Sequence, residues 1–211
     1  MDNIQFQLIS SKKNTSNNLK RYCFIKRSFD ITVSLIGLIL LFPLMIVFSI
    51  LIYIESPGKV IFQQERIGKN GNSFILYKIR SMRLDAERNG QQWTQKNDPR
   101  ILKVGKFIRK TKIDELPQLI NILKGDMTLV GPRPETPKLT LEFNDQYPGF
   151  INRLIVTPGL TGLAQISGGY DLNPYEKLKK DLEYIEKQSL IIDAWILLNT
   201  FPVIIAGKGI R

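Results

Sequence analysis

Two adjacent carboxylates, Asp114 and Glu115 (the acidic pair), follow a run of cations near the middle of the chain. The cations are Lys106, Arg109, Lys110 and Lys112. A carboxylate held among cations stays ionised, and it can then attack phosphorus or bind a divalent metal ion. The ordinary alternative is helix capping, because Thr111 and Asp114 have the spacing of a capping box. The acidic pair by itself does not decide between these two interpretations.

A short amphipathic helix is predicted directly after the acidic pair. Its apolar face would consist of Leu116, Leu119, Ile120 and Leu123. Gly125 marks its end, and Pro117 is tolerated only in a first helical turn, so the helix is predicted to begin close to Ile113 or Asp114. The acidic pair would then lie at the helix N-terminus, where free backbone N–H groups and partial positive charge gather.

The composition narrows the chemistry that such a site can use. The 211 residues carry a formal charge of +11, which favours nucleic acid, a phosphorylated ligand or an acidic membrane as partner. Histidine is absent from the sequence, which excludes Ser-His-Asp and Cys-His catalysis, histidine bases and His-ligated zinc. The single cysteine, Cys23, excludes an internal disulfide and fits a reducing compartment. Carboxylates, lysine, tyrosine or this thiol must therefore carry any acid–base or nucleophilic step.

An uncharged apolar run at residues 31–54 follows a polar segment at residues 1–20 that is predicted to be a flexible tail. As a helix the run could extend roughly 36 Å, which is enough to cross the hydrocarbon core of a bilayer. A signal peptide is disfavoured, because the run is too long and lacks a small-residue cleavage site after it. Hydropathy alone predicts a spanning helix.

We favour a third topology, a re-entrant helix that enters and leaves by the same membrane face. Pro43 lies near the middle of the run and must kink a helix there by deleting one backbone hydrogen bond. Basic residues occur on both sides, with Lys26 and Arg27 before the run and Lys59 and Arg66 after it. A spanning helix would place one of these sets on the side that the positive-inside rule disfavours. A re-entrant helix places both sets on the cytoplasmic face.

Further along the chain, short strands and helices alternate in the predicted structure. Residues 60–67 and 73–80 are predicted to form a β-hairpin, and its second strand would present Lys78 and Arg80 on one face. Residues 81–100 are polar, with Trp93 as the one large apolar group. Two prolines fix the backbone around Arg133, which suits a guanidinium held rigidly for a phosphate, although a rigid loop without function is the ordinary alternative.

The last third of the chain combines a glycine-rich loop with predicted helices. The loop, residues 157–169, could bring backbone amides close to an anion, but it lacks a Walker or Rossmann spacing. Helices are predicted at residues 142–155, with a break at Pro148 and Gly149, and at residues 175–188 and 191–206. The last of these is too short and interrupted for a second span, and it fits a helix that lies in the membrane interface.

Taken together, these stretches resemble the bacterial sugar transferase family, the monotopic polyprenyl-phosphate phosphoglycosyl transferases that begin cell-surface glycan assembly. The resemblance covers about residues 20–200 and rests on the ordered conjunction of several motifs, none of them decisive alone. In chain order the motifs are Lys26-Arg27-x-x-Asp30, Gln64-x-Arg66-x-Gly68, Tyr77-Lys78-x-Arg80-Ser81-Met82, Asp98-Pro99-Arg100, Arg109-Lys110-Thr111-x-x-Asp114-Glu115-Leu116-Pro117-Gln118, Leu123-Lys124-Gly125-Asp126-Met127, Gly131-Pro132-Arg133-Pro134 and Pro158-Gly159-x-Thr161-Gly162-x-Ala164-Gln165.

The resemblance implies a membrane enzyme that moves a sugar-1-phosphate from a UDP-sugar to undecaprenyl phosphate and releases UMP. In the family, the Asp of the Asp-Glu pair is the nucleophile and forms a covalent phosphosugar–aspartyl intermediate, which the lipid phosphate then attacks. Carried over to this chain, Asp114 is the nucleophile, and Asp114 and Glu115 lie beside a Mg²⁺ ion that bridges the diphosphate. The implied substrate-binding residues are Lys78, Arg80, Arg109, Arg133 and Gln165.

The expected fold is α+β and mainly helical, with a kinked re-entrant membrane helix, a small β-hairpin and catalytic helices at the membrane interface. The expected divisions are a flexible tail at residues 1–20, a membrane helix-hairpin at residues 21–58 and a catalytic domain on the cytoplasmic face at residues 59–211. The protein would be monotopic in the bacterial inner membrane, in contact with its lipids. Whether it forms a homo-oligomer stays open, because the helix at residues 191–206 could pack on a partner as readily as on lipid.

Two positions depart from the family pattern. The family often has Ser-Pro at the re-entrant break, whereas here Phe42 precedes Pro43, so a hydroxyl that could bond freed carbonyls is missing. The loop after Gln165 often ends in Arg, whereas here it ends in Gly168 and Gly169. Two other functions are alternatives. A non-catalytic membrane-anchored scaffold of the same fold would have no use for the acidic pair and its cations, and a nucleic-acid-binding protein with a membrane anchor is disfavoured because the sequence shows no stacking platform.

Overall fold

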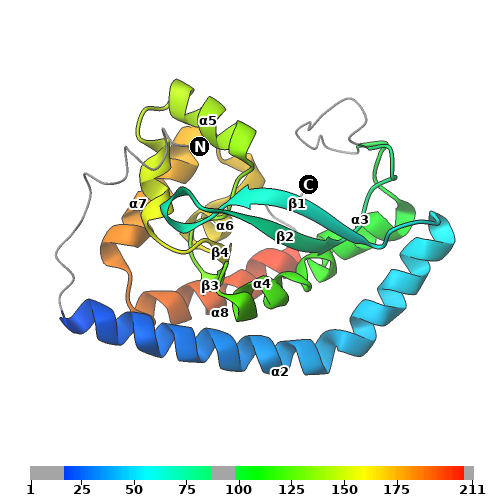
Figure 1. Ribbon diagram of the computed structural model, residues 1–211, viewed down its shortest axis with the longest axis horizontal. Helices are drawn as coiled ribbons and strands as arrows, with labels where there is room; N and C mark the ends of the chain where they lie inside the picture. The colour runs from blue at the N-terminus through cyan, green and yellow to red at the C-terminus, as the bar shows by residue number, and fades with distance from the viewer. Residues whose placement is uncertain (1–16, 87–97, 207–211) are drawn as a thin grey trace.

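The computed structural model describes residues 17–86 and 98–206. Most of these residues are helical, and two small two-stranded sheets lie among the helices (Figure 1). The mainly helical class with small sheets and one long apolar N-terminal helix is therefore confirmed. Trp93 and most of the predicted tail lie outside the described residues.

The longest element is the apolar helix α2 (Asn17–Glu55), which begins inside the segment predicted to be a tail. It is continuous through Pro43, and Figure 1 shows it bending along its course. Much of its apolar surface is exposed, with Leu40 and Ile54 each 70% exposed and Phe42 57% exposed. Among the described residues, α2 is the one helix long and apolar enough to cross a membrane.

Both ends of α2 are hydrogen-bonded to the rest of the protein. Near its start, the Arg27 guanidinium donates to two carbonyl oxygens in the last turn of α4 (Gln118–Lys124), at 2.6 and 2.8 Å. At its end, the Glu55 carboxylate accepts from the first two backbone N–H groups of α3 (Lys103–Lys110), at 2.6 and 2.9 Å. These bonds engage backbone groups in the last turn of α4 and the first turn of α3, so they fix α2 against one body near its start and at its end.

The first sheet is the predicted hairpin. Strands β1 (Ile61–Ile67) and β2 (Ser73–Ile79) pair antiparallel, joined by a short 3₁₀ turn, η2 (Lys69–Gly71). The even-numbered side chains of both strands, Leu76 among them, are less exposed than their neighbours at positions 61, 63, 65, 73 and 75, so they form the inner face. Ile67 and Ile79, at the last position of each strand, are buried as well. The predicted strands, residues 60–67 and 73–80, agree with these boundaries to within one residue.

The second sheet replaces the glycine-rich loop predicted for residues 157–169, and that prediction is wrong. Strand β3 (Thr128–Val130) pairs parallel with β4 (Gly159–Thr161), and helix α6 (Leu163–Ser167) follows. A Cβ on Gly159 would lie 2.1 Å from the backbone nitrogen of Gly131. These glycines therefore permit close approach of two backbones, and they do not form an open anion-binding loop.

The remaining helices follow their capping signals. Helix α5 (Pro137–Gln146) begins earlier than predicted because Thr136 caps it, accepting from the backbone N–H of Leu139. The predicted break at Pro148 and Gly149 is confirmed, since the chain then continues as a 3₁₀ helix, η4 (Phe150–Ile155). The 3₁₀ turn η5 (Gly169–Asp171), α7 (Pro174–Lys187) and α8 (Leu190–Ala206) complete the described chain.

Apolar side chains from both halves of the chain share a core around α4. Its buried members are Leu76, Leu119, Ile122, Met127, Leu129, Val130, Tyr184 and Ile196. Ile120, predicted for the same apolar face, is instead 39% exposed. A second cluster joins the later half of α2 to β2 and α3 through Met45, Ile52, Ile79, Leu102 and Ile108. The two clusters hold the α3–α4 connection, which carries the acidic pair, against β2.

Candidate active site

The acidic pair lies in a separate 3₁₀ turn, η3 (Ile113–Glu115), and not in the first turn of the following α-helix. Helix α4 begins only at Gln118, with Pro117 as its N-cap, and it ends as predicted at a left-handed Gly125 (φ 94°). The chain reverses at Lys112, which is itself left-handed (φ 61°). Helical structure therefore begins at Ile113, as predicted, but its first turn is 3₁₀ and the α-helix itself starts only at Gln118.

The capping box considered for Thr111 and Asp114 does not form. The Thr111 hydroxyl donates to the carbonyl of Phe107 at 2.9 Å, so it closes α3 instead of capping the next helix. Asp114 is consequently not engaged by the helix start, and its carboxylate faces the surrounding charges.

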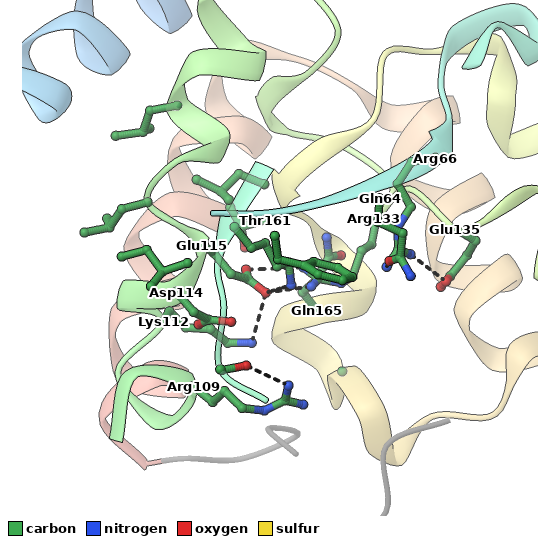
Figure 2. Close-up of a pocket in the computed structure, with 18 of the residues that line it drawn as sticks. Gln64, Arg66, Arg109, Lys112, Asp114, Glu115, Arg133, Glu135, Thr161 and Gln165 are labelled. Carbon is green, nitrogen blue, oxygen red and sulfur yellow. Dashed lines mark hydrogen bonds and ion pairs between the residues drawn. The ribbon is translucent and has the colours of Figure 1, made fainter. Parts of the chain in front are cut away.

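One cavity of about 1200 Å³ contains both members of the acidic pair. All five predicted substrate-binding residues line it: Lys78, Arg80, Arg109, Arg133 and Gln165. They come from β2 and the residue after it, α3, the Gly-Pro-Arg-Pro segment and α6, which are far apart in sequence. Figure 2 shows Arg109, Asp114 and Glu115 toward one end of the labelled side chains and Arg66 and Glu135 at the other.

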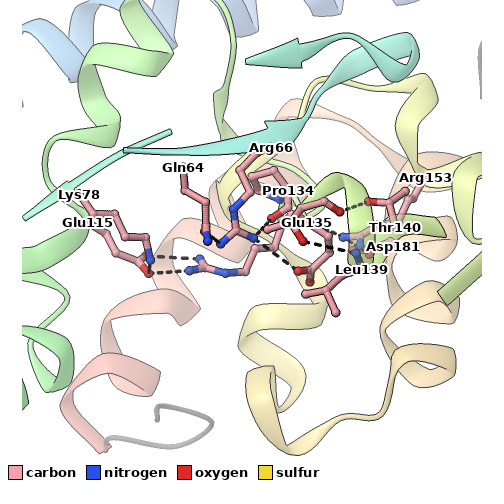
Figure 3. A network of polar contacts seen from close by, with 12 residues as sticks. Gln64, Arg66, Lys78, Glu115, Pro134, Glu135, Leu139, Thr140, Arg153 and Asp181 are labelled. Atoms are coloured by element: carbon pink, nitrogen blue, oxygen red, sulfur yellow. Dashed lines mark hydrogen bonds and ion pairs between the residues drawn. The ribbon is translucent and has the colours of Figure 1, made fainter. Parts of the chain in front are cut away.

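Glu115 is the centre of a cluster of ion pairs. Its carboxylate lies 2.6 Å from Arg133, 3.0 Å from Lys78 and 3.7 Å from Lys112 (Figures 2 and 3). Burial alone would raise the pKa of Glu115, but the charges of Arg133, Lys112 and Lys78 outweigh burial and hold that pKa well below its ordinary value. Glu115 is therefore ionised at neutral pH, and its oxygens are already engaged by cations.

Asp114 differs from Glu115 in its hydrogen bonding. Its side chain is buried, and its Oδ1 atom has no hydrogen-bond partner among the residues that the structure describes. Burial raises the pKa of Asp114 and the Glu115 carboxylate adds to the rise, while Lys78, Lys112 and Arg109 oppose it. A buried, unbonded carboxylate oxygen surrounded by cations can attack an electrophile or bind a metal, because no hydrogen bond must first be broken.

Arg80 and Arg109 extend this positive wall of the cavity. Arg109 donates to the Ser81 hydroxyl at 3.3 Å. Arg80 is only 5% exposed and donates to the carbonyl of Ser56, just beyond α2. Burial lowers the pKa of Arg80. Lys78 and Arg80 thus point toward the cavity, although they contact different partners.

Arg133 is positioned through its own backbone. Arg153 donates to the Arg133 carbonyl at 2.6 Å and forms an ion pair with Asp181 at 2.8 Å (Figure 3). Both members of this ion pair are almost completely buried. Sequence reasoning missed Arg153 and Asp181, because a buried ion pair between η4 and α7 leaves no local pattern.

Arg66 holds the other side of the Arg133 segment. It donates to the Pro134 carbonyl at 3.0 Å and lies 3.5 Å from the Glu135 carboxylate. Its second terminal nitrogen donates to Gln64 at 2.5 Å. The Gln64-x-Arg66 motif, noted in the sequence without a role, therefore positions this part of the cavity wall.

Gln165, in α6, also lines the cavity. Its amide nitrogen is 3.5 Å from the Gly131 carbonyl, and its Oε1 atom is buried without a hydrogen-bond partner in the described chain. Gly169, where the family often has Arg, lines the same cavity. A substrate hydrogen-bond donor would satisfy Gln165 Oε1.

The residues at this site fit a Mg²⁺ ion whose coordination is completed by the substrate. The described residues contain no group of three or more acidic, histidine or cysteine side chains that could hold a metal by themselves. Mg²⁺ is commonly bound by one or two carboxylates, with water and substrate phosphates completing its shell. The unpartnered Oδ1 of Asp114 suits that role, whereas the Glu115 oxygens are occupied by cations.

Comparison with known proteins identifies the family that the sequence motifs resemble. The model of the family described as bacterial sugar transferase matches residues 21–207. A Bacillus subtilis protein named for undecaprenyl-phosphate N-acetylgalactosaminyl 1-phosphate transfer is 55% identical over 139 residues, covering 66% of this chain and 78% of that protein.

Two longer relatives match over most of this chain. The UDP-N-acetylgalactosamine-undecaprenyl-phosphate N-acetylgalactosaminephosphotransferase of Aeromonas hydrophila is 44% identical, covering 90% of this chain and 46% of that protein. The UDP-glucose:undecaprenyl-phosphate glucose-1-phosphate transferase of Escherichia coli is 40% identical, covering 83% of this chain and 39% of that protein. The chain thus spans less than half the length of these two relatives.

Proposed function

The chain belongs to the bacterial sugar transferase family, and we propose that it is an undecaprenyl-phosphate sugar-1-phosphate transferase that uses a UDP-sugar to begin polysaccharide synthesis. The observation that carries the proposal is the buried, unbonded Asp114 oxygen in a cavity lined by cations. Relatives named for this transfer act on N-acetylgalactosamine, glucose or galactose. A UDP-hexose or UDP-N-acetylhexosamine is therefore the donor class.

In the proposed reaction Asp114 is the nucleophile. An Asp114 oxygen attacks the phosphorus that carries the sugar, forming a P–O bond, while the bond to the UMP oxygen breaks and UMP leaves with the electron pair. An oxygen of undecaprenyl phosphate then attacks the same phosphorus and releases the Asp114 carboxylate. Both attacking groups are anions, so neither step needs a histidine base.

Charge stabilisation is the main contribution of the other side chains. Arg133, Lys78 and Lys112, which Glu115 holds in place, would contact the phosphate oxygens on which charge accumulates. When bound at Asp114, Mg²⁺ would neutralise part of the diphosphate charge. Gln165 and the rigid Arg133 segment would orient the donor.

The apolar helix indicates membrane association, and we place the protein as a monotopic enzyme on the cytoplasmic face of the inner membrane. Both ends of α2 are bonded to the same body, at Arg27 and at Glu55, which supports the re-entrant topology. A helix that crossed the bilayer once would separate its two ends by about 30 Å of hydrocarbon. Exposed apolar residues of α8, such as Ile191 and Ile205, support an interfacial position for that helix.

The test is UMP release by detergent-solubilised protein with Mg²⁺, undecaprenyl phosphate and a panel of UDP-sugars that includes N-acetylgalactosamine, galactose and glucose. We expect release with at least one donor, dependence on Mg²⁺ and loss of activity in Asp114→Asn. Asp145→Asn removes an exposed carboxylate outside the cavity and should retain activity. Folded protein that is silent with the whole panel would favour a non-catalytic scaffold. Activity that persists in Asp114→Asn would exclude Asp114 as nucleophile.

A further inference from the structure

Arg80 is a buried cation without an anion. Its side chain is 5% exposed, and none of the ion pairs in the described part of the chain includes it. One terminal nitrogen donates to the Ser56 carbonyl, while Nε and Nη1 are buried and lack hydrogen-bond partners among the described residues. A buried, unpaired charge is costly, so this arrangement is expected where a bound anion completes the site.

Arg80 shares a cavity with the catalytic carboxylate. Arg80 lines the same cavity as Asp114, and the neighbouring Ser81 hydroxyl accepts from Arg109. Arg109 acts electrostatically on Asp114. An anion bound by Arg80 and Arg109 would therefore occupy the same cavity as the reacting phosphorus.

The position of Arg80 relative to α2 distinguishes which anion binds there. Ser56 directly follows the last residue of α2, and the backbone N–H of Arg80 donates to Val60 at 2.7 Å. Arg80 is thus fixed at the point where the apolar helix ends. A phosphate attached to a polyprenyl chain must stay near that level, because its tail remains in the apolar phase.

The nucleotide has a better site at the other end of the cavity. Gln64, Arg66 and Glu135 line that part of the cavity, and Figure 2 shows them away from Arg109. Hydrogen-bonding side chains of both charge signs suit a sugar nucleotide, which carries hydroxyls, amides and phosphates.

We propose that Arg80, assisted by Arg109, binds the phosphate of the polyprenyl-phosphate acceptor and is needed mainly for the second half of the reaction. The proposal rests on the proposed function. In the second step the acceptor oxygen forms a bond to the phosphorus held on Asp114, and the Asp114–phosphorus bond breaks. The Arg80 guanidinium neutralises the acceptor phosphate as it approaches and takes no proton.

The two half-reactions can be measured separately. Without acceptor, labelled UMP exchanges into the UDP-sugar that the wild-type protein uses, which reports the first half alone. With acceptor, the dependence of turnover on undecaprenyl phosphate concentration reports the second. A neutral detergent makes the acceptor the only lipid phosphate present.

In Arg80→Met we expect UMP exchange near the wild-type rate and a loss of about 10- to 100-fold in kcat/KM for undecaprenyl phosphate, the size of one charged hydrogen-bonding contact. Arg80→Lys keeps the charge but not the planar guanidinium, so its kcat/KM for undecaprenyl phosphate should lie between those of the wild-type protein and Arg80→Met. If Arg80→Met does not fold, Arg80→Lys provides the test instead, because UMP exchange by that variant shows that it is folded. Lys69→Met, at an exposed cation of η2 outside the cavity lining, controls for the loss of one positive charge.

The outcomes separate this inference from the proposed function. Exchange and transfer by the wild-type protein establish the function whatever Arg80 does. Equal loss of both half-reactions in the Arg80 variants would assign Arg80 to the donor and overturn the inference. Unchanged kcat/KM for undecaprenyl phosphate would overturn it as well.

Discussion

Replacing Arg153 with methionine removes one charge of a deeply buried ion pair. The side chains of Arg153 and Asp181 are 3% and 1% exposed and approach to 2.8 Å. Burial raises the pKa of Asp181 to about 6, although the charge of Arg153 opposes the rise. In Arg153→Met the Asp181 carboxylate would have to remain charged without its partner or take up a proton.

The magnitude follows from the pKa of Asp181. A rise from 3.8 to about 6 corresponds to ~3 kcal/mol of folding free energy at 1.36 kcal/mol per pKa unit. The folded protein keeps this proton in a pH range where the unfolded chain has lost it. Asp181 therefore lowers stability progressively as pH rises from about 4 to 6, and the loss is complete above that range.

Breaking the buried pair should add to that loss at neutral pH. We expect Arg153→Met to destabilise the fold by ~3–5 kcal/mol at pH 7.5 and by less at pH 5, where Asp181 is already largely protonated. Arg153→Met combined with Asp181→Asn removes both charges. Its cost should fall to ~1–2 kcal/mol, mainly for the lost hydrogen bond to the Arg133 carbonyl and the lost contact with the Phe150 ring.

Chemical unfolding of the four proteins of this cycle, in the same detergent at pH 5 and 7.5, measures both effects. If the two single substitutions simply add in the double variant, or if the cost of Arg153→Met is the same at both pH values, the electrostatic argument is wrong. UMP exchange by the double variant tests in addition whether the Arg153 hydrogen bond positions Arg133.

Two further predictions concern α2. Arg27→Met should lower the free energy of unfolding by ~1.5–3 kcal/mol, because the last turn of α4 loses its charged hydrogen-bond donor. Chemical unfolding of this variant and of Arg21→Met, which changes an exposed residue, measures the effect. An equal loss of stability in the two variants would argue against this role of Arg27. A membrane-impermeant maleimide should label Cys23 in inside-out vesicles and not in intact cells, and Lys59→Cys combined with Cys23→Ser should behave in the same way. Labelling of position 59 from the outside alone would instead show that α2 spans the bilayer.

Local patterns in the sequence already determined several elements. Two short strand-like stretches separated by a turn at residues 68–71 predicted the hairpin β1–β2, because a glycine-containing turn between two strands favours antiparallel pairing. Gly125 predicted the end of α4, since glycine adopts the left-handed conformation at low cost. The ordered motifs also identified the family and brought forward the five cavity-lining residues as candidates, because chemical type and spacing are properties of the sequence itself.

Only the tertiary structure decided that the two carboxylates of the acidic pair have different bonding partners. Glu115 is neutralised by Lys78 and Arg133, which approach from other elements, while Asp114 keeps a buried oxygen without a hydrogen bond. In the sequence the two carboxylates are simply neighbours. Their different environments arise because the packing of α3, α4 and β2 directs one toward the cations and leaves the other unbonded.

The same distinction explains the predictions that were wrong. The glycines at residues 159 and 162 suggested an anion-binding loop, but they are required by the close pairing of β3 and β4. The Arg153–Asp181 ion pair and the contacts at both ends of α2 join segments that are far apart along the chain. Such contacts depend on which surfaces meet in three dimensions, and local propensity carries no information about that.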